Sequence, residues 1–379
     1  MPQREPKPRF VTPLSQVLTE YLEAHPMHQL DFAEYLNIGE RTLRRWKNGE
    51  DVLTDIRELK RIAELLGVAP ERLGVAASLS VTLTPDEIDA AIEHGWKLAR
   101  AGRYYEVQVI VEKLLRDVAN LIQTEDVNLL RKLANVQHVA GYIKSQTSRA
   151  DKTDVAFYHY REMERIARIL HDQTLINIAL SYEGDMLQRG GNVEESIRYL
   201  EAARDTTPLA DTAARGNGIQ LLGRAYFKAG RLGDFERAMK EAEALTYEPQ
   251  IPDLSNSVRG QYCAGTVYEE WGRSVGLLGK MEEALAHLDK ADQIFSHTWT
   301  MQRRDMLMKT ARAMVLVRNG DIREGVEIAV EAIALCRKHG NLRLLDRVYG
   351  LQQYLDRLTK EIGNAGSLLR EALDGPIEY

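Results

Sequence analysis

The sequence has few of the features that mark membrane, secreted or disulfide-bonded proteins. No run approaches the 18 consecutive apolar residues of a membrane span, and no apolar run follows the basic residues near the start, so we expect no signal peptide. Only two cysteines occur in 379 residues, and Cys263 and Cys336 lie in separate helical patterns. We interpret both as small, reduced core residues and expect a cytoplasmic protein.

Motifs of common enzymes are also scarce. There is no HExxH and no CxxC sequence, and the glycines of residues 216–223 and 276–281 lack the spacing of nucleotide-binding loops. The nine histidines are scattered, and the closest two, His25 and His28, lie beside Pro26 in an expected turn. We therefore expect no enzymatic activity, no cofactor and no metal site.

A strongly basic composition is missing as well. The chain has 50 Lys and Arg against 56 Asp and Glu, a net charge of −6, and residues 1–75 have 11 basic and 12 acidic residues. This balance argues against general coating of nucleic acid and against binding to an anionic membrane. Positive charge is instead concentrated in one short segment, residues 40–47.

Residues 29–49 have the pattern of two short helices joined by a turn. Ala33 is small enough for two helices to cross closely, and Asn37 tolerates the left-handed backbone that a turn requires. The large apolar side chains fall at spacings that direct them into one small core, and these are Phe32, Leu36, Ile38, Leu43 and Trp46. The segment predicts a helix-turn-helix.

The second helix of this motif, expected at Glu40–Lys47, has a cationic outer face. Such a helix suits the major groove of DNA, because Arg reaches guanine edges with a bidentate fork and any cation reaches phosphate. We expect its arginines to approach bases, and Gln29, Lys47 and Asn48 to contact phosphates. The candidate DNA-binding residues are Gln29, Arg41, Thr42, Arg44, Arg45, Lys47 and Asn48. The alternative is a charged helical hairpin with no role on DNA.

The flanking residues complete a small domain of about five short helices at 10–75. Thr12-Pro13 starts a helix, with Pro at the first helical position. Thr54 is expected to cap a further helix at 55–66. Residues 76–84 have neither helical spacing nor charge, and we interpret them as a linker.

The remainder of the chain, from Thr84 onward, has helical patterns throughout and an internal repeat. Four segments share the order glycine, polar, apolar, two polar, small: Gly191–Ser196, Gly233–Ala238, Gly279–Ala284 and Gly320–Gly325. Glycine ends one helix, the next helix starts at once, and the small residue lets the pair pack closely. We count about six helix pairs within 85–340, followed by a final helical segment to about residue 373.

The N-terminal motif resembles the helix-turn-helix of Cro/repressor-type (XRE-like) DNA-binding domains. In that family a Gln opens the first helix, an Ala follows four residues later, and a Trp-x-x-Gly sequence often closes the second helix. Gln29, Ala33 and Trp46–Gly49 match this pattern. Asn37 and Gly39 depart from it, because the family usually has Gly at the turn and Ser or Thr at the cap of the second helix.

The repeats resemble the tetratricopeptide (TPR) repeat. The best-matching unit has Gly184, Gly191, Ser196, Leu200, Ala203 and Pro208 at the family's small and apolar positions. The spacings between copies exceed the family's period of about 34 residues, so the helices are longer than usual. The resemblance implies an all-α, right-handed superhelix of TPR-like hairpins at 85–373, a ligand-sensing and dimerisation domain with a concave groove. The alternative is an unrelated α-helical bundle.

In a TPR unit the first helix lines the concave face. Counting along the helices from Gly184, Gly223 and Gly265 places a polar lining with aromatic residues on that face. The candidate peptide-binding residues are Asn177, Ser181, Asp185, Asn217, Gln220, Arg224, Tyr262 and Glu269. The alternative is an ordinary solvated helix face.

Together the two resemblances cover nearly the whole chain, which looks similar to the peptide-responsive regulators of Gram-positive bacteria and their phages (the RRNPP group and the arbitrium receptors). That similarity implies a cytoplasmic homodimer that binds promoter DNA and holds a short signalling peptide in its groove. Two alternatives are a scaffold or antagonist that acts on a partner protein, and a regulator with a small-molecule effector. We expect the dimer interface to use the C-terminal apolar pattern of Leu342, Leu344, Leu345, Val348, Leu351, Tyr354, Leu355 and Leu358.

Overall fold

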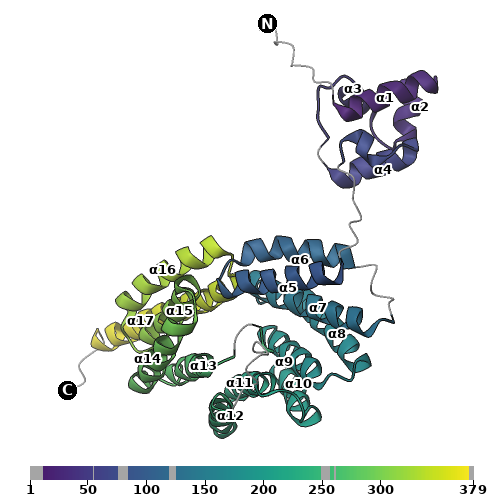
Figure 1. The fold of residues 1–379 in the computed structure, drawn as a ribbon. Helices are drawn as coiled ribbons and strands as arrows, with labels where there is room; N and C mark the ends of the chain where they lie inside the picture. Colours follow the sequence, from purple (N-terminus) through teal and green to yellow (C-terminus); the bar gives the residue numbers. More distant parts are fainter. Residues whose placement is uncertain are drawn as a thin grey trace. The chain divides into compact units, whose positions relative to one another are not determined.

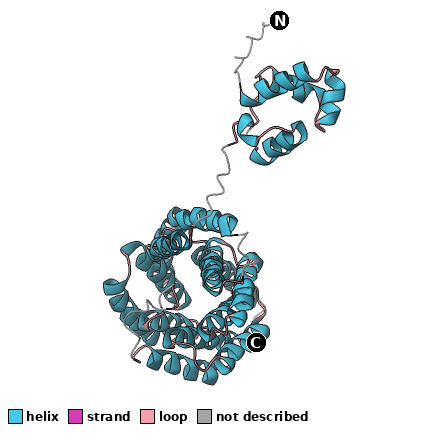
Figure 2. Cartoon of the chain, turned by 45° about the vertical axis from the view of Figure 1, so that its right-hand side comes forward, coloured by secondary structure: helices cyan, strands magenta, loops and turns pink. Residues whose placement is uncertain are grey.

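The computed structural model describes residues 12–53, 55–75, 84–118, 125–248, 257–259 and 262–374. Within these ranges the regular secondary structure is helical and contains no β-strand (Figures 1 and 2). The chain divides into two compact units, residues 1–81 and 82–379, which are described separately. No helix in the described ranges is long and apolar enough to span a membrane. The predicted all-α fold class is confirmed.

The N-terminal unit is built from short helices with well-defined starts. Thr12 begins α1 with a capping box, in which its hydroxyl accepts a hydrogen bond from the Ser15 N–H at 3.0 Å. The carboxylate of Asp55 caps α4 by accepting from the Arg57 N–H at 2.9 Å. Thr54, the predicted cap, lies outside the described residues. The helices are α1 Pro13–Ala24, α2 Gln29–Tyr35, α3 Glu40–Lys47, α4 Ile56–Leu66 and a 3₁₀ turn at Pro70–Leu73.

The core of this unit forms where the predicted apolar positions meet. Asn37 lies between α2 and α3 in the left-handed region, with φ 51°, as the predicted turn requires. Because the turn reverses the chain there, α2 and α3 bring their apolar faces together over α1 and α4. The predicted helix-turn-helix is confirmed, with Phe32, Leu36, Leu43 and Trp46 buried and Ile38 partly buried in one cluster.

The C-terminal unit contains the six predicted helix pairs and a final long helix. Thr84 starts the first pair with a capping box to Glu87, so the predicted linker overlaps this helix start. Residues 76–83 of that linker lie outside the described residues. The pairs are α5 Pro85–Arg100 with α6 Tyr104–Val118, α7 Val127–Thr147 with α8 Asp154–Ile169, α9 Gln173–Arg189 with α10 Val193–Thr206, α11 Thr212–Lys228 with α12 Leu232–Leu245, α13 Ala264–Gly276 with α14 Met281–Thr298, and α15 Met301–Arg318 with α16 Ile322–His339, followed by α17 Leu342–Leu373.

In every pair except α7 with α8, the turn between the two helices uses a glycine in the left-handed region. Gly191, Gly279 and Gly320 have positive φ and stand one residue before the cap of the second helix, as predicted. In the fourth pair this role belongs to Gly230, with φ 75°, whereas Gly233 lies inside α12. The sequence alignment therefore placed this copy three residues too late.

In four of the pairs a second glycine stands seven residues before the turn glycine, where the two helices cross, and these are Gly95, Gly184, Gly223 and Gly272. A Cβ added to Gly184 would lie 2.6 Å from Leu200, and one added to Gly272 would lie 2.8 Å from the carbonyl oxygen of Ala284. The predicted register from Gly265 was therefore wrong by seven residues. Because seven residues are about two helical turns, this error leaves Thr266 and Glu269 on the predicted concave face.

The two ends of the repeat array meet, so that the C-terminal unit forms a ring of helices (Figure 2). Helix α17 packs against α7 and α15. The carboxylate of Asp346 on α17 accepts a hydrogen bond from the Ala150 N–H at 2.6 Å and lies 3.5 Å from the Arg149 guanidinium. This packing buries Leu344, Leu345, Val348 and Leu351 within the unit. Half of the residues predicted for the dimer interface were therefore assigned wrongly.

Candidate functional sites

The cationic face of α3 is exposed because the apolar face holds the helix against the core. Leu43 and Trp46 are buried, which turns Arg41 and Arg44 outward into solvent. The helix starts at Gly39, which has no side chain to cap the first turn. The N–H groups of that turn and the positive end of the helix dipole therefore favour an anion at the same surface.

The other candidate DNA-binding residues are partly engaged within the unit. Arg45 forms an ion pair with Asp51 at 3.0 Å, with the two side chains 39% and 45% exposed. Asn48 donates its side-chain amide to Glu50 at 3.0 Å. A DNA phosphate can compete for both groups, since surface ion pairs contribute little free energy. The remaining candidates are half-buried at the same motif, and these are Gln29, Thr42 and Lys47.

The repeat unit has a central cavity on the side of the first helices, as the TPR resemblance implied. It encloses about 830 Å³ of space between atoms, part of it open to solvent, and its walls come from α6, α7, α9, α11, α13, α15 and α17. Six of the eight candidate peptide-binding residues line it: Asp185, Asn217, Gln220, Arg224, Tyr262 and Glu269. Their contact with a peptide stays a prediction.

Asn177 and Ser181 do not line this cavity, so their predicted placement was wrong. The Asn177 amide donates to the Ala203 carbonyl at 3.0 Å and to the Thr207 hydroxyl at 2.8 Å. Both groups belong to the end of α10 and the turn after it. Ser181 is fully buried, 3.5 Å from the Asn177 oxygen, and faces Gly218 of α11. The pair holds neighbouring helices together.

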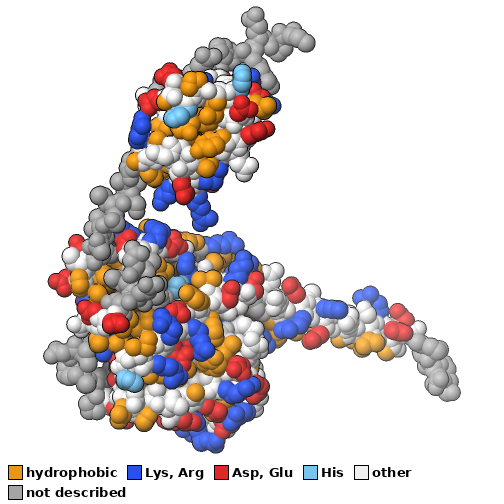
Figure 3. Space-filling view, turned by 90° about the vertical axis from the view of Figure 1, so that its right-hand side faces the viewer, with side chains coloured by type: hydrophobic (Ala, Val, Ile, Leu, Met, Phe, Trp, Pro, Cys, Tyr) orange, Lys and Arg blue, Asp and Glu red, His pale blue; other side chains and the backbone are white. Residues whose placement is uncertain are grey.

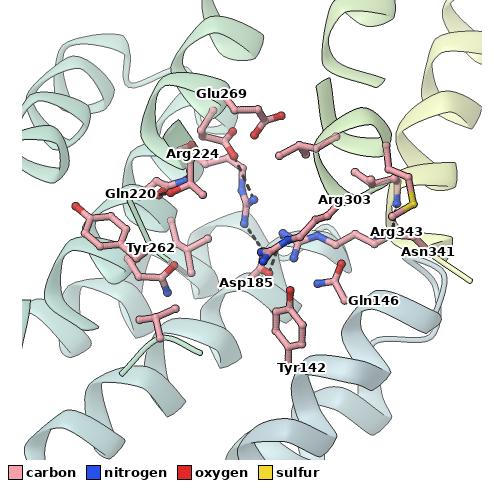
Figure 4. Close-up of a pocket in the computed structure, with 18 of the residues that line it drawn as sticks. Tyr142, Gln146, Asp185, Gln220, Arg224, Tyr262, Glu269, Arg303, Asn341 and Arg343 are labelled. Atoms are coloured by element: carbon pink, nitrogen blue, oxygen red, sulfur yellow. Dashed lines mark hydrogen bonds and ion pairs between the residues drawn. The ribbon is translucent and has the colours of Figure 1, made fainter. Parts of the chain in front are cut away.

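The cavity is crossed by a network of buried ion pairs (Figure 4). Asp185 on α9 pairs with Arg224 of α11 and, at 3.3 Å, with Arg343 of α17. Glu269 on α13 pairs with Arg347 of α17 at 2.9 Å and with a neighbouring arginine of α13, Arg273, at 3.2 Å. Asp185 therefore joins α9 to α11 and α17, and Glu269 joins α13 to α17, which fixes α17 to the other helices of the ring.

The titration of these groups reflects their burial and their ion pairs. Burial opposes ionisation of Asp185, but Arg224 and Arg343 outweigh it and hold the pKa of this carboxyl well below its usual range. Burial, and then the neighbouring Arg273, lower the pKa of Arg347 to about 10. Burial opposes the charge of Arg343 as well, but Asp185 outweighs it and raises the pKa of that guanidinium.

Sequence reasoning missed several cavity residues. Arg303, Arg343 and Arg347 come from α15 and α17, whereas the prediction counted only α9, α11 and α13. It also passed over Gly272–Gly276, which has the Gly-x-Ser-x-Gly spacing of serine hydrolases. This segment lies within α13 and Ser274 is buried in packing, so it lacks the strand–turn–helix of a nucleophile. In the described ranges no three His, Cys, Asp or Glu side chains are arranged to hold a metal.

Comparison with protein families identifies the first of the two units. Residues 18–73 match the helix-turn-helix family HTH_3, over the same helices that present Arg41 and Arg44. The N-terminal unit contains a helix-turn-helix DNA-binding domain. The predicted resemblance of this segment is thereby confirmed, and no curated protein matches the chain.

Solved structures that are similar to the chain include the following two. One is Bacillus thuringiensis PlcR in complex with the peptide PapR7 and DNA, with 11% identity, TM-score 0.40, and coverage of 76% of this chain and 95% of PlcR. Another is the TPR-like repeat protein described as a putative kinesin light chain of Podosopora anserina, with 17% identity, TM-score 0.36, and coverage of 57% of this chain and 98% of that protein.

Proposed function

We propose that this protein is a cytoplasmic transcription regulator whose binding to operator DNA is controlled by a short signalling peptide in the central cavity. One observation carries the proposal: a helix-turn-helix domain with an exposed cationic helix is joined in one chain to a ring of helical repeats that encloses a polar cavity. The first part supplies an output on DNA, and the second supplies a ligand site.

On DNA, α3 enters the major groove with its cationic face. Arg41 and Arg44 are exposed and have the length and donor geometry to reach base edges, so they carry most of the sequence selectivity. Lys47 and Asn48, at the end of α3, and Gln29, at the start of α2, contact phosphates and set the docking angle. The ion pair of Arg45 with Asp51 opens when a phosphate replaces the carboxylate.

A peptide suits the cavity because its walls offer both polar and aromatic contacts. Asn217 and Gln220 carry amides that pair with the N–H and C=O groups of an extended backbone. Tyr142, Tyr262 and Trp299 offer flat apolar surfaces for side chains. The lining comes from seven helices of the ring, so a ligand there contacts most of the repeats at once.

Two arguments support a homodimer: the surface that operator recognition requires, and the apolar pattern at the C-terminal end of α17. A single helix-turn-helix buries too little surface for tight specific binding, and dimers match two-fold operators. From Leu355 to Ala372 the apolar residues of α17 recur with alternating steps of three and four, which is the pattern of a coiled coil. Figure 3 shows this part of the helix extending from the repeat unit. The stripe consists of Leu355, Leu358, Ile362, Ala365, Leu369 and Ala372.

Binding of the purified chain to fragments of its own genome tests the proposal. We expect sequence-selective, salt-sensitive binding in at least one of two states, free or loaded with a peptide extract of the culture medium. The two states should differ in affinity by about fivefold or more, the usual lower range of allosteric coupling. Absence of selective binding in both states would refute the DNA output. Equal affinities would refute peptide control and favour a partner-protein scaffold or a small-molecule effector.

A further inference from the structure

We propose that the central cavity recognises its ligand through a carboxylate, carried by an acidic side chain or by the C-terminus of a short peptide. The inference deepens the proposed function, because it names the chemistry of the ligand in the same cavity. Its basis is an imbalance within the lining, where positive charge and hydrogen-bond donors exceed the groups that satisfy them.

The charge imbalance is visible in the cavity walls. The lining has four arginines and three carboxylates, and the carboxylates are Asp185, Glu269 and Glu270. Arg273, buried directly behind Glu269 and Glu270, adds a fifth guanidinium. Burial, and then Arg343, also lower the pKa of the neighbouring Arg189 to about 10, which agrees with a surplus of positive charge. An anion entering the cavity would reduce this surplus.

Hydrogen-bonding capacity is unbalanced in the same direction. Glu269 and Glu270 each accept hydrogen bonds from two arginines, and Asp185 accepts one from Arg224 and forms an ion pair with Arg343 at 3.3 Å, so each carboxylate is already paired with two cations. Arg343 and Arg347, by contrast, each have one carboxylate partner among the described residues, and a guanidinium carries five N–H donors. The side-chain nitrogen of Asn217 is buried at the cavity wall and has no hydrogen-bond partner in the described part of the chain. What the lining lacks is a further negative charge beside these donors.

The position of these donors gives the carboxylate a mechanical role. Asn217 lies on α11, in the middle of the array, whereas Arg343 and Arg347 lie on α17, the helix that closes the ring against α7. A ligand whose carboxylate binds Arg343 or Arg347 while another of its groups contacts Asn217 would connect the middle repeats to the closing helix. Ligand binding would thus stabilise the closed ring and fix the exposed end of α17. Figure 4 shows the side chains of Arg224 and Arg343 converging on Asp185.

Selection from defined peptide pools tests the inference on the full chain. The probes are randomised pentapeptides of Asp, Glu, Gly, Ala and Leu, and a matched pool with Asn and Gln in place of the acids, each as C-terminal acid and as amide. Peptides retained after gel filtration are identified by mass spectrometry. We expect acidic or free-acid peptides to be retained about tenfold better than neutral amides, as for a charge-assisted hydrogen bond. Preference for the acidic amide pool assigns a side-chain carboxylate, and preference for the neutral free acid assigns the C-terminus. Equal retention of neutral amides, or retention of no pool, would overturn the inference.

Two isosteric variants complete the test. Asn217→Asp replaces the unpartnered donor with a carboxylate and should lower retention of the acidic pool by about tenfold or more, because it repels the bound anion. Asn364→Asp adds the same charge on the exposed end of α17 and should leave retention unchanged. Thermal unfolding verifies that both variants fold. Full retention by a folded Asn217→Asp variant would overturn the inference. If acidic peptides bind but leave operator affinity unchanged, the proposed function fails while this inference stands.

Discussion

The guanidinium of Arg343, in the first turn of α17, lies 3.3 Å from the carboxylate of Asp185 on α9. Nearly 160 residues separate the two in sequence, yet both side chains meet in the central cavity. Asp185 also binds Arg224, so one buried carboxylate joins three helices. This contact, with that of Asp346 to the Ala150 N–H, explains how a linear array of repeats becomes a closed ring.

Removal of Asp185 should destabilise the repeat unit severely. In the Asp185→Asn variant two arginines face each other in a buried site without their shared counter-ion, and breaking a buried pair typically costs about 3–5 kcal/mol. The free energy of unfolding is measured by urea denaturation. As a control, Arg323→Gln breaks a pair of exposed side chains on α16 and should change that free energy by less than about 0.5 kcal/mol. Similar effects for both variants would contradict the role of the network.

A buried glutamate predicts the dependence of stability on pH. Burial, and then the neighbouring Glu164, raise the pKa of Glu183 to about 8 in the fold, while its side chain is fully buried beside Arg161 at 3.2 Å. Because the folded pKa exceeds the unfolded one of about 4.3, the favourable contribution of the neutral carboxyl is complete below that value. It is lost as pH rises through 8. Glu183→Gln, which stays neutral, should therefore raise the melting temperature more at pH 9 than at pH 5.

Calorimetric scans of both proteins at the two pH values check this sign. Glu195→Gln offers a matched control, because Glu195 forms an ion pair with Arg198 at 2.8 Å on the surface of α10. Its effect on the melting temperature should be small at both pH values. A Glu183→Gln variant that is stabilised equally at pH 5 and pH 9 would show that the carboxyl is ionised in the fold across this range.

Local signals in the sequence were enough to predict the DNA-binding motif. The turn at Asn37, the apolar spacing of α2 and α3 and the cations of α3 all lie within about 20 residues. In the repeat unit, the six helix pairs and the wall made by α9 and α11 followed from the glycine spacing. Gly230 was missed because Gly233 offered the same local pattern, and only the backbone conformation distinguishes them.

The rest of the cavity depends on long-range packing, which one sequence does not reveal. Arg343 and Arg347 reach the cavity only because α17 folds back onto α7, and the apolar pattern of α17 fits a dimer interface as well as a ring closure. Asn177 was misplaced for a related reason. On α9, Asn177 lies one helical turn before Ser181. The end of α10 and the loop after it cover both side chains and accept the hydrogen bonds of the Asn177 amide.

Substitutions in α3 should separate base reading from phosphate contact. Arg41→Ala or Arg44→Ala should cost about 1–3 kcal/mol of binding at one base pair of the operator and relax specificity there. Lys47→Ala should weaken all sequences alike and reduce the slope of log affinity against log salt concentration by about one unit. Titrations of operator and base-substituted duplexes at several salt concentrations measure both effects. Arg323→Ala, an exposed arginine of the repeat unit, is the control. Uniform losses for all three α3 variants would contradict the assignment of base-reading roles.

Charge placed on the exposed stripe of α17 should separate the dimer. Ile362 and Leu369 are 62% and 63% exposed on the same stripe, and neither contributes to the buried clusters of the repeat unit. Ile362→Asp should therefore leave the melting temperature of the monomer unchanged, while it introduces two facing charges into a coiled-coil seam. Light scattering at micromolar concentration should report a dimer for the unmodified chain and a monomer for the variant, with operator affinity reduced about a hundredfold or more because half-site contacts no longer add. Leu209→Asp, which alters an 81% exposed leucine between α10 and α11, is the matched control and should remain dimeric. A dimeric Ile362→Asp variant with full operator affinity would place the two-fold interface on another face of the molecule.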